Sequence, residues 1–143
     1  MKHYLLFAML FFFCSCDPWC VINVSYRNNT DNRITVKTSS NLRIDTDETI
    51  VDINAGSKVE VYHHQLFLGR FTVDKHTAFE DVKSNFYGAL VTFKSEDGKE
   101  VSFTIDNPYA ANSPYDIDNY SANKSRGTEI KLTYTITDAI FEQ

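Results

Sequence analysis

Cysteine is absent from most of this chain of 143 residues, because Cys14, Cys16 and Cys20 all fall within the segment FFFCSCDPWC. The body of the chain must therefore fold on its hydrophobic core, without internal disulfides. The CxC pair also lacks nearby metal partners, since the nearest histidines are His3 and the distant His63, and no CxxC motif occurs. Neither a disulfide framework nor a metal site is expected from these cysteines.

A long apolar run is also missing. The longest one covers residues 4–13 and has ten residues, whereas a helix needs about 20 residues to cross a bilayer core of roughly 30 Å. The run follows Lys2 and precedes the small residue Ser15. This arrangement is typical of an export signal and is too short for a membrane span.

Positive charge is scarce, with 14 Lys and Arg residues against 19 Asp and Glu residues. Without residues 1–15, which contain Lys2 and no acidic residue, 13 basic and 19 acidic residues remain, a net charge of −6. Such a chain is poorly suited to neutralising phosphates, so no nucleic-acid partner is expected. No internal repeat or low-complexity segment divides the remaining 128 residues, which indicates a single domain.

The segment 13–16 resembles the cleavage box of a bacterial lipoprotein, in which a small residue precedes the cysteine that receives the lipid. Only Cys16 follows a small residue, Ser15, whereas Cys14 follows Phe13 and Cys20 follows Trp19. The resemblance implies that residues 1–15 are cleaved, that Cys16 is lipidated with palmitate-type chains, and that residues 16–20 form an anchor and short tether. An ordinary secretory signal is the alternative.

The aromatic-rich run and the SCD junction are most similar to lipoproteins of the Bacteroidetes group. That resemblance implies an outer-membrane location, with the cell surface and the periplasmic face both left open, because only Asp17 follows Cys16 before Pro18. Cys20 is then left over, either as a small buried hydrophobic residue at the start of a strand or as a free thiol.

Residues 21–143 alternate mostly with a period of two. The segment VSFTID places Val101, Phe103 and Ile105 on one face, and EIKLTYTIT alternates in the same way from residue 130 to residue 136. Similar patterns occur at 22–26, 34–36, 51–53 and 59–61. Seven or eight short strands with regular turns predict an all-β, antiparallel, two-sheet sandwich, with a small β-barrel as the alternative.

Three turn sequences predict hairpins. A three-residue loop at 96–98 with a left-handed Gly98 sets Phe93 opposite Val101 and Val91 opposite Phe103, which keeps core residues on one face. The NNTDN segment is expected to return the chain so that residue 26 faces residue 34, and NAGSK so that residue 53 faces residue 59. The chain from residue 21 to residue 62 thereby resembles the opening hairpins of immunoglobulin-like or transthyretin-like sandwiches in small Bacteroidetes lipoproteins.

One segment, KHTAFEDVKSNF, has helical spacing at Phe79, Val82 and Phe86. Thr77 is the expected N-cap, with Glu80 in the capping-box position. A short helix here is predicted to bridge the two sheets or to close one end of the sandwich.

The search for catalytic or metal chemistry finds little. His63 shares a predicted strand face with Val59 and Val61, so it is expected to be partly buried and hydrogen-bonded, and adjacent His64 points to the other face. No HExxH or G-x-S-x-G motif occurs, so no metal, no cofactor and no enzymatic activity are expected. A small hydrolase is the distant alternative, and it requires that His63 or His76 meet a carboxylate in a pocket.

The long connection at 107–128 contains Tyr109, Tyr115 and Tyr120 among many Asn, Asp and Ser residues. As a glycan-binding accessory of a surface sugar-uptake system, the protein would present these three rings on one exposed platform. In the alternative, the rings fold back over the end of the core. The general expectation is a lipid-anchored, non-enzymatic binding or accessory module. A structural component of the envelope, which would pair through an exposed sheet edge or apolar patch, is the other hypothesis.

Overall fold

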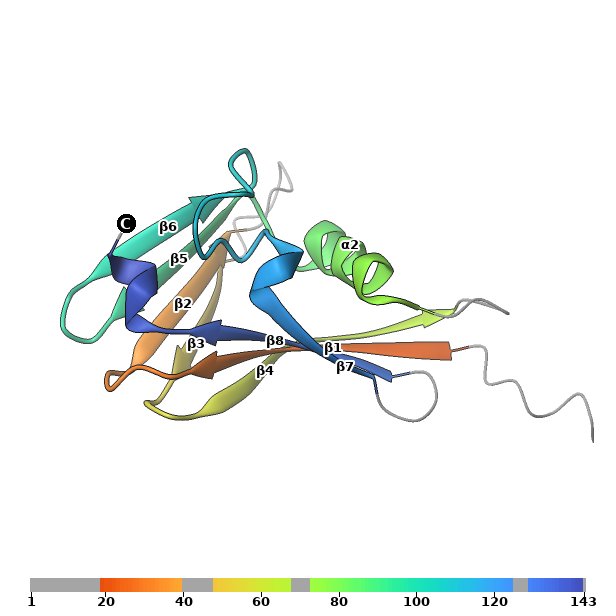
Figure 1. Ribbon diagram of the computed structural model, residues 1–143, viewed down its shortest axis with the longest axis horizontal. Coiled ribbons are helices and arrows are strands. Elements are labelled where there is room, and N and C mark those ends of the chain that lie inside the picture. Colours follow the sequence, from red (N-terminus) through yellow and green to blue (C-terminus); the bar gives the residue numbers. More distant parts are fainter. Residues whose placement is uncertain (1–18, 40–47, 68–72, 125–128, 143) are drawn as a thin grey trace, which may run out of the picture.

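The computed structural model describes residues 19–39, 48–67, 73–124 and 129–142, which form eight strands, one α-helix and two 3-10 segments (Figure 1). In chain order the elements are β1 (Trp19–Asn28), β2 (Ile34–Ser39), β3 (Glu48–Ile53), β4 (Lys58–Phe67), α2 (Lys75–Asn85), β5 (Leu90–Ser95), β6 (Glu100–Thr104), η1 (Ile117–Asn119), β7 (Tyr120–Lys124), β8 (Glu129–Ile136) and η2 (Asp138–Phe141). None of the described helices is both long and apolar enough to cross a membrane.

Two four-stranded sheets confirm the predicted sandwich. One sheet has the order β4-β1-β8-β7 and the other the order β3-β2-β5-β6, so each sheet is open and the alternative of a closed barrel is wrong. All strand pairs are antiparallel except β1 and β8, which run parallel at the centre of the first sheet. The expected fully antiparallel arrangement therefore fails at this one pair. Pairing in parallel is available to β1 and β8 because almost the whole domain separates them in sequence.

The β5–β6 hairpin forms in the predicted register. Phe93 lies opposite Val101 and Val91 opposite Phe103. Gly98 has a φ of 93°, and its N–H donates to the Ser95 carbonyl at 3.0 Å, which closes the turn. Since no atom lies within 4 Å of the position where a Cβ would be, the glycine serves the backbone conformation and not close packing.

The other two predicted hairpins are wrong, because both turns carry the chain from one sheet to the other. Asn28, fully buried at the end of β1, explains the first turn. Its amide donates to the carbonyls of Asn32 (2.7 Å) and Ile53 (3.0 Å), and its Oδ1 accepts from the Thr30 N–H at 2.9 Å. The Asn28 N–H also donates to the Ser57 carbonyl at 2.9 Å. Asn28 thus connects the turn after β1 to the turn after β3. The two opening hairpins on which the family resemblance rested do not form.

A β-bulge in β4 changes which side chains face the core. Val59 pairs with Tyr26, but Tyr62 pairs with Val24, so Val61 is left without a paired residue on β1. One extra residue reverses the alternation that follows. His64 therefore lies on the core side of the strand, and the expectation that the partly buried histidine is His63 is wrong.

Helix α2 confirms the predicted helical segment, although its start differs. Asp74, and not Thr77, is the N-cap, because its Oδ1 accepts from the Thr77 N–H at 2.7 Å. Ala78, Phe79 and Val82 are buried. In Figure 1 the helix covers the part of the β4-β1-β8-β7 sheet over which the other sheet does not extend. It therefore closes one end of the sandwich, which is one of the two positions that the sequence predicted.

Candidate functional site

The predicted lipidation residue, Cys16, lies outside the described residues, but the fold begins directly after it. β1 starts at Trp19, two residues earlier than the expected domain boundary at residue 21. Cys20 is unpaired and buried, with its Sγ 3.8 Å from the Val21 carbonyl oxygen. Burial raises the pKa of its thiol, and the charge of Lys124 partly opposes that effect. Cys20 thus behaves as the small buried residue that was one of the two alternatives.

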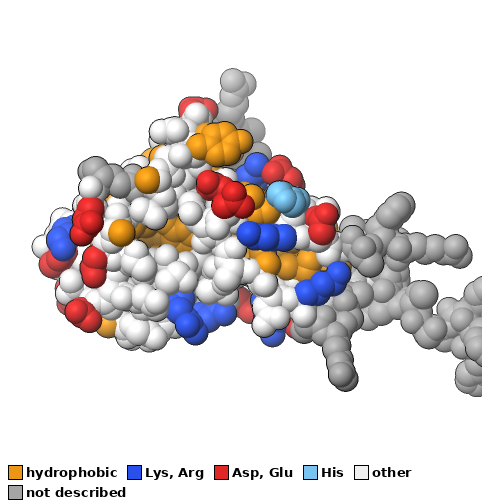
Figure 2. All heavy atoms as spheres, in the orientation of Figure 1, with side chains coloured by type: hydrophobic (Ala, Val, Ile, Leu, Met, Phe, Trp, Pro, Cys, Tyr) orange, Lys and Arg blue, Asp and Glu red, His pale blue; other side chains and the backbone are white. Residues whose placement is uncertain are grey.

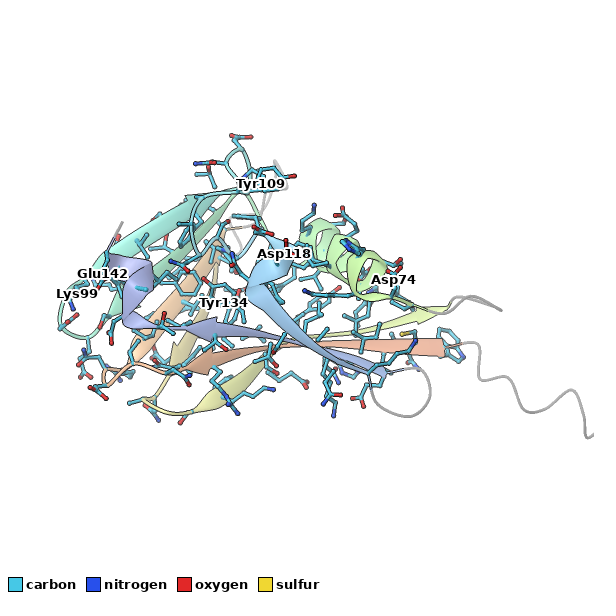
Figure 3. The ribbon with its side chains drawn as sticks, viewed as in Figure 1. Asp74, Lys99, Tyr109, Asp118, Tyr134 and Glu142 are labelled. Carbon is cyan, nitrogen blue, oxygen red and sulfur yellow. The ribbon has the colours of Figure 1, made fainter. Side chains whose placement is uncertain are left out.

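The three tyrosines of the 107–128 segment do not form an exposed platform. Tyr109 is 85% exposed, whereas Tyr115 and Tyr120 are only 2% and 3% exposed. Figure 3 shows Tyr109 on the loop that follows β6, away from the interior. The expected platform is wrong because the segment is not an extended loop. Successive hydrogen bonds between residues three apart fold residues 104–119 back on themselves, and residues 120–124 form β7.

The buried tyrosine hydroxyls form a chain that determines its own direction. Tyr26 donates to the Tyr87 hydroxyl at 3.0 Å, and Tyr120 donates to the Pro114 carbonyl at 2.9 Å. Because each hydroxyl has one proton, the bond between Tyr87 and Tyr120 must be donated by Tyr87. Burial is the main cause that raises the pKa of Tyr26, Tyr87 and Tyr120 well above the usual value. This chain satisfies polar groups within the core.

The bulge in β4 brings His64 to a carboxylate that the sequence did not indicate. Its Nδ1 lies 2.9 Å from Oδ2 of Asp81 on α2, the same oxygen that accepts from the Tyr62 hydroxyl at 3.0 Å. The other oxygen, Oδ1, accepts from the Asn85 amide at 2.9 Å. With three partners the Asp81 carboxylate fastens helix α2 to the edge strand β4. The spacing of Tyr62 and His64 could have indicated a shared face, but the bulge could not be foreseen.

The other two histidines in the described part of the chain, His63 and His76, lie apart from this cluster. His63 contacts Oδ1 of Asn23 at 2.6 Å and is 4.0 Å from Oε1 of Glu60, with both the imidazole and the carboxylate side chain more than half exposed. His76 is exposed on the first turn of α2. Within the described ranges, no three His, Cys, Asp or Glu side chains lie close enough to hold a metal ion.

A cleft of about 240 Å³ lies where the folded-back segment meets the end of β8, and we call it the polar cleft. Figure 3 shows Tyr134 of β8 near the centre, with Asp118 of η1 on one side and Glu142, which follows η2, on the other. None of the six residues that line the polar cleft is charged; they are Asn112, Asn119, Tyr134, Thr135, Thr137 and Ile140.

The walls of the polar cleft are fixed by hydrogen bonds. Asn112 has a left-handed φ of 57°, its carbonyl accepts from the Tyr134 hydroxyl, and its amide donates to the Ala139 carbonyl at 3.4 Å. The Asn119 amide donates to the carbonyl of buried Ser113 at 2.8 Å. The side-chain NH₂ group of each asparagine therefore donates to a backbone carbonyl of the protein. Their Oδ1 atoms make no hydrogen bond with other described residues.

The described part of the chain has exposed sheet edges and several exposed large hydrophobic residues. The sheet edges are β4, β7, β3 and β6, and the residues of β7 after Tyr120 are exposed. Figure 2 shows acidic and basic side chains lying among one another on one face, with hydrophobic side chains in separate patches. The large hydrophobic residues that are exposed come from different elements; they are Trp19, Ile50, Leu90, Ile105 and Tyr109.

The sequence matches no family model and no curated protein. The candidate sites therefore rest on geometry alone.

Proposed function

We propose that the protein is a lipid-anchored, non-enzymatic component of the cell envelope that holds a β-sandwich binding module close to a membrane surface. The observation that supports it most is the short distance between the anchor and the fold. Only Asp17 and Pro18 separate Cys16 from Trp19, the first residue of β1. Three residue steps span at most about 11 Å, so a lipid on Cys16 would hold the domain within roughly one Debye length of the headgroups.

The mechanism is tethering. Each buried CH₂ group of an acyl chain contributes about 0.8 kcal/mol to membrane binding, and stable anchoring requires more than one chain or a second signal. The beginning of β1 would face the membrane, and the end of β1 that carries Asn28 would face the aqueous phase. We propose that the anchor lies in the outer membrane, with the domain at the cell surface or on the periplasmic side.

The anchor is tested by the substitution Cys16→Ala in the full chain, with metabolic labelling by a fatty acid as the measurement. The label should be lost, because the thioether acceptor is removed. Cys14→Ser is the matched control: it changes the neighbouring cysteine, which the proposal assigns to the cleaved signal, and should be labelled normally. Labelling that survives in the Cys16→Ala protein would refute the assignment, and mass spectrometry of the mature N-terminus gives an independent answer.

A further inference from the structure

We propose that the polar cleft is a binding site for an uncharged, hydroxyl-rich ligand of the size of one sugar residue. This inference rests on the proposed function, because it names the ligand class of the anchored binding module. It concerns residues other than the three tyrosines of the 107–128 segment, of which two are buried.

The residues that line the cleft indicate which class of ligand it would bind. Two asparagines and two threonines, Asn112, Asn119, Thr135 and Thr137, line the cleft, so its lining residues carry uncharged amide and hydroxyl groups. No hydrogen bond joins either threonine hydroxyl to another described residue, and Thr137 makes no side-chain cap bond to η2. Uncharged amide and hydroxyl groups match the alternating donors and acceptors of a neutral sugar. A carboxylated or phosphorylated ligand would find no cation in the cleft to compensate its charge.

Size and shape lead to the same class. At about 240 Å³ the cleft is smaller than the sites that hold drug-sized molecules, which occupy roughly 300–1,000 Å³. Tyr134 and Ile140 also line the cleft, but both are almost fully buried and expose little apolar surface to it. The ligand is therefore one terminal sugar residue and not an extended chain.

The walls are also preorganised. Asn112 has a left-handed backbone conformation, and two hydrogen bonds hold it. Its carbonyl accepts from the Tyr134 hydroxyl of β8, and its side-chain amide donates to the Ala139 carbonyl of η2. Asparagine tolerates this conformation better than most residues, and its carbonyl and amide are both used to hold it. Such a wall loses little further freedom when a ligand binds, which favours affinity.

The position of the cleft suits a tethered module. Tyr134 pairs with Tyr26 on the parallel strand β1, seven residues beyond Trp19. At about 3.3 Å per residue the cleft lies roughly 23 Å along the sheet from the membrane-proximal end. It would therefore open to the aqueous phase, where glycans are found, and not among the headgroups.

The test is a titration of the full chain in detergent micelles, followed by NMR of the Asn112 and Asn119 side-chain amides. The probes are D-glucose, D-galactose and N-acetyl-D-glucosamine, with D-glucuronate as the charged comparison. At least one neutral sugar should give saturable shifts at both amides, with a dissociation constant on the order of millimolar for a ligand this small.

Two isosteric variants and one control decide whether binding occurs in the cleft. Thr135→Val and Thr137→Val each remove one hydroxyl and should weaken binding by about 3- to 10-fold. Thr49→Val, an exposed threonine on β3 in the other sheet, should bind like the unchanged protein. All three positions are exposed, so the fold is retained, which a thermal melt verifies.

Three results would overturn the proposal: no shift with any neutral sugar, equal affinity in all three variants, or tighter binding of D-glucuronate than of D-glucose. The anchor is measured separately on the same preparations by fatty-acid labelling. Sugar binding that is absent from a labelled protein refutes the cleft alone, whereas sugar binding by an unlabelled protein refutes the anchor alone.

Discussion

Single hydroxyl groups matter in this core because it contains an unusual row of tyrosines. Tyr26, Tyr87 and Tyr120 pass hydrogen bonds in one direction to the Pro114 carbonyl. Because the bonds run in one direction, the hydroxyls of Tyr87 and Tyr120 each accept the proton of the tyrosine before them. A buried donor without an acceptor costs about 1–3 kcal/mol, whereas an acceptor that already makes another bond loses less.

The substitution Tyr87→Phe should therefore lower the free energy of unfolding by about 1–3 kcal/mol, because it leaves the Tyr26 proton without an acceptor. Tyr26→Phe should cost less, at about 1 kcal/mol or below, because it removes only the first donor of the row. Both variants keep the ring and its packing, so urea denaturation measures the hydroxyl alone. Equal losses in the two variants would contradict the assigned direction.

Ionisation of the same side chains predicts an alkaline limit to stability. Burial raises the pKa of these three tyrosines well above the usual value of 10, so the unfolded chain releases their protons first. Stability is thus fully present below pH 10 and should fall above it, by about 1.4 kcal/mol per pH unit for each tyrosine. Urea denaturation between about pH 9 and 12 measures the slope.

At the scale of elements, the sequence predicted strands better than their partners. Alternation in 90–95 and 100–104, together with the position of Gly98, determined a whole hairpin correctly, because both strands had to keep core residues on one face. The NNTDN and NAGSK turns were misjudged since nothing local distinguishes a hairpin turn from a corner between sheets. The contacts that distinguish the two cases are the hydrogen bonds from the Asn28 amide to the carbonyls of Asn32 and Ile53, and these exist only in the folded molecule.

The candidate site was harder to predict for the same reason. The polar cleft combines asparagines from the folded-back segment with threonines from the end of β8, and no local spacing relates the two. Likewise, Asp81 appeared in the sequence only as a polar position of a helix, and the bulge that brings Tyr62 and His64 to it leaves no clear pattern in the sequence. The sequence shows how many tyrosine, asparagine and threonine residues the chain has, but it does not show which of them meet in the folded protein.

Helix α2 should depend on Asp81 for its attachment to the sheet. Asp81→Ala removes the acceptor of Tyr62, His64 and Asn85, and we expect stability to fall by about 1–3 kcal/mol. Hydrogen exchange in residues 75–85 should accelerate more than exchange in the strands. Glu80→Ala is the matched control on the same helix, because its ion pair with Lys83 involves a largely exposed carboxylate and contributes about 0–1 kcal/mol. A loss as large in the control would contradict the role of Asp81.

On the scale of the whole molecule, the proposed anchor on Cys16 would lie at one end of a sheet, with loops and the polar cleft farther along it. β1 and β8 run parallel, so with the proposed anchor before β1 the sandwich would stand away from the membrane. Trp19 reports on this arrangement, because it is the one tryptophan of the chain, it begins β1 and it is 42% exposed. Indole rings favour the interface between headgroups and hydrocarbon.

The proposed orientation predicts how Trp19 fluorescence responds to membranes. In vesicles that contain the lipidated full chain, a quencher attached to lipid headgroups should reduce the Trp19 emission, and Cys16→Ala protein mixed with the same vesicles should be unaffected. Ten Gly and Ser residues inserted between Pro18 and Trp19 add a mean span of about 17 Å and should weaken the quenching. If the longer tether leaves the quenching unchanged, the surface of the domain itself binds the membrane, and the short connection to Cys16 does not set its orientation.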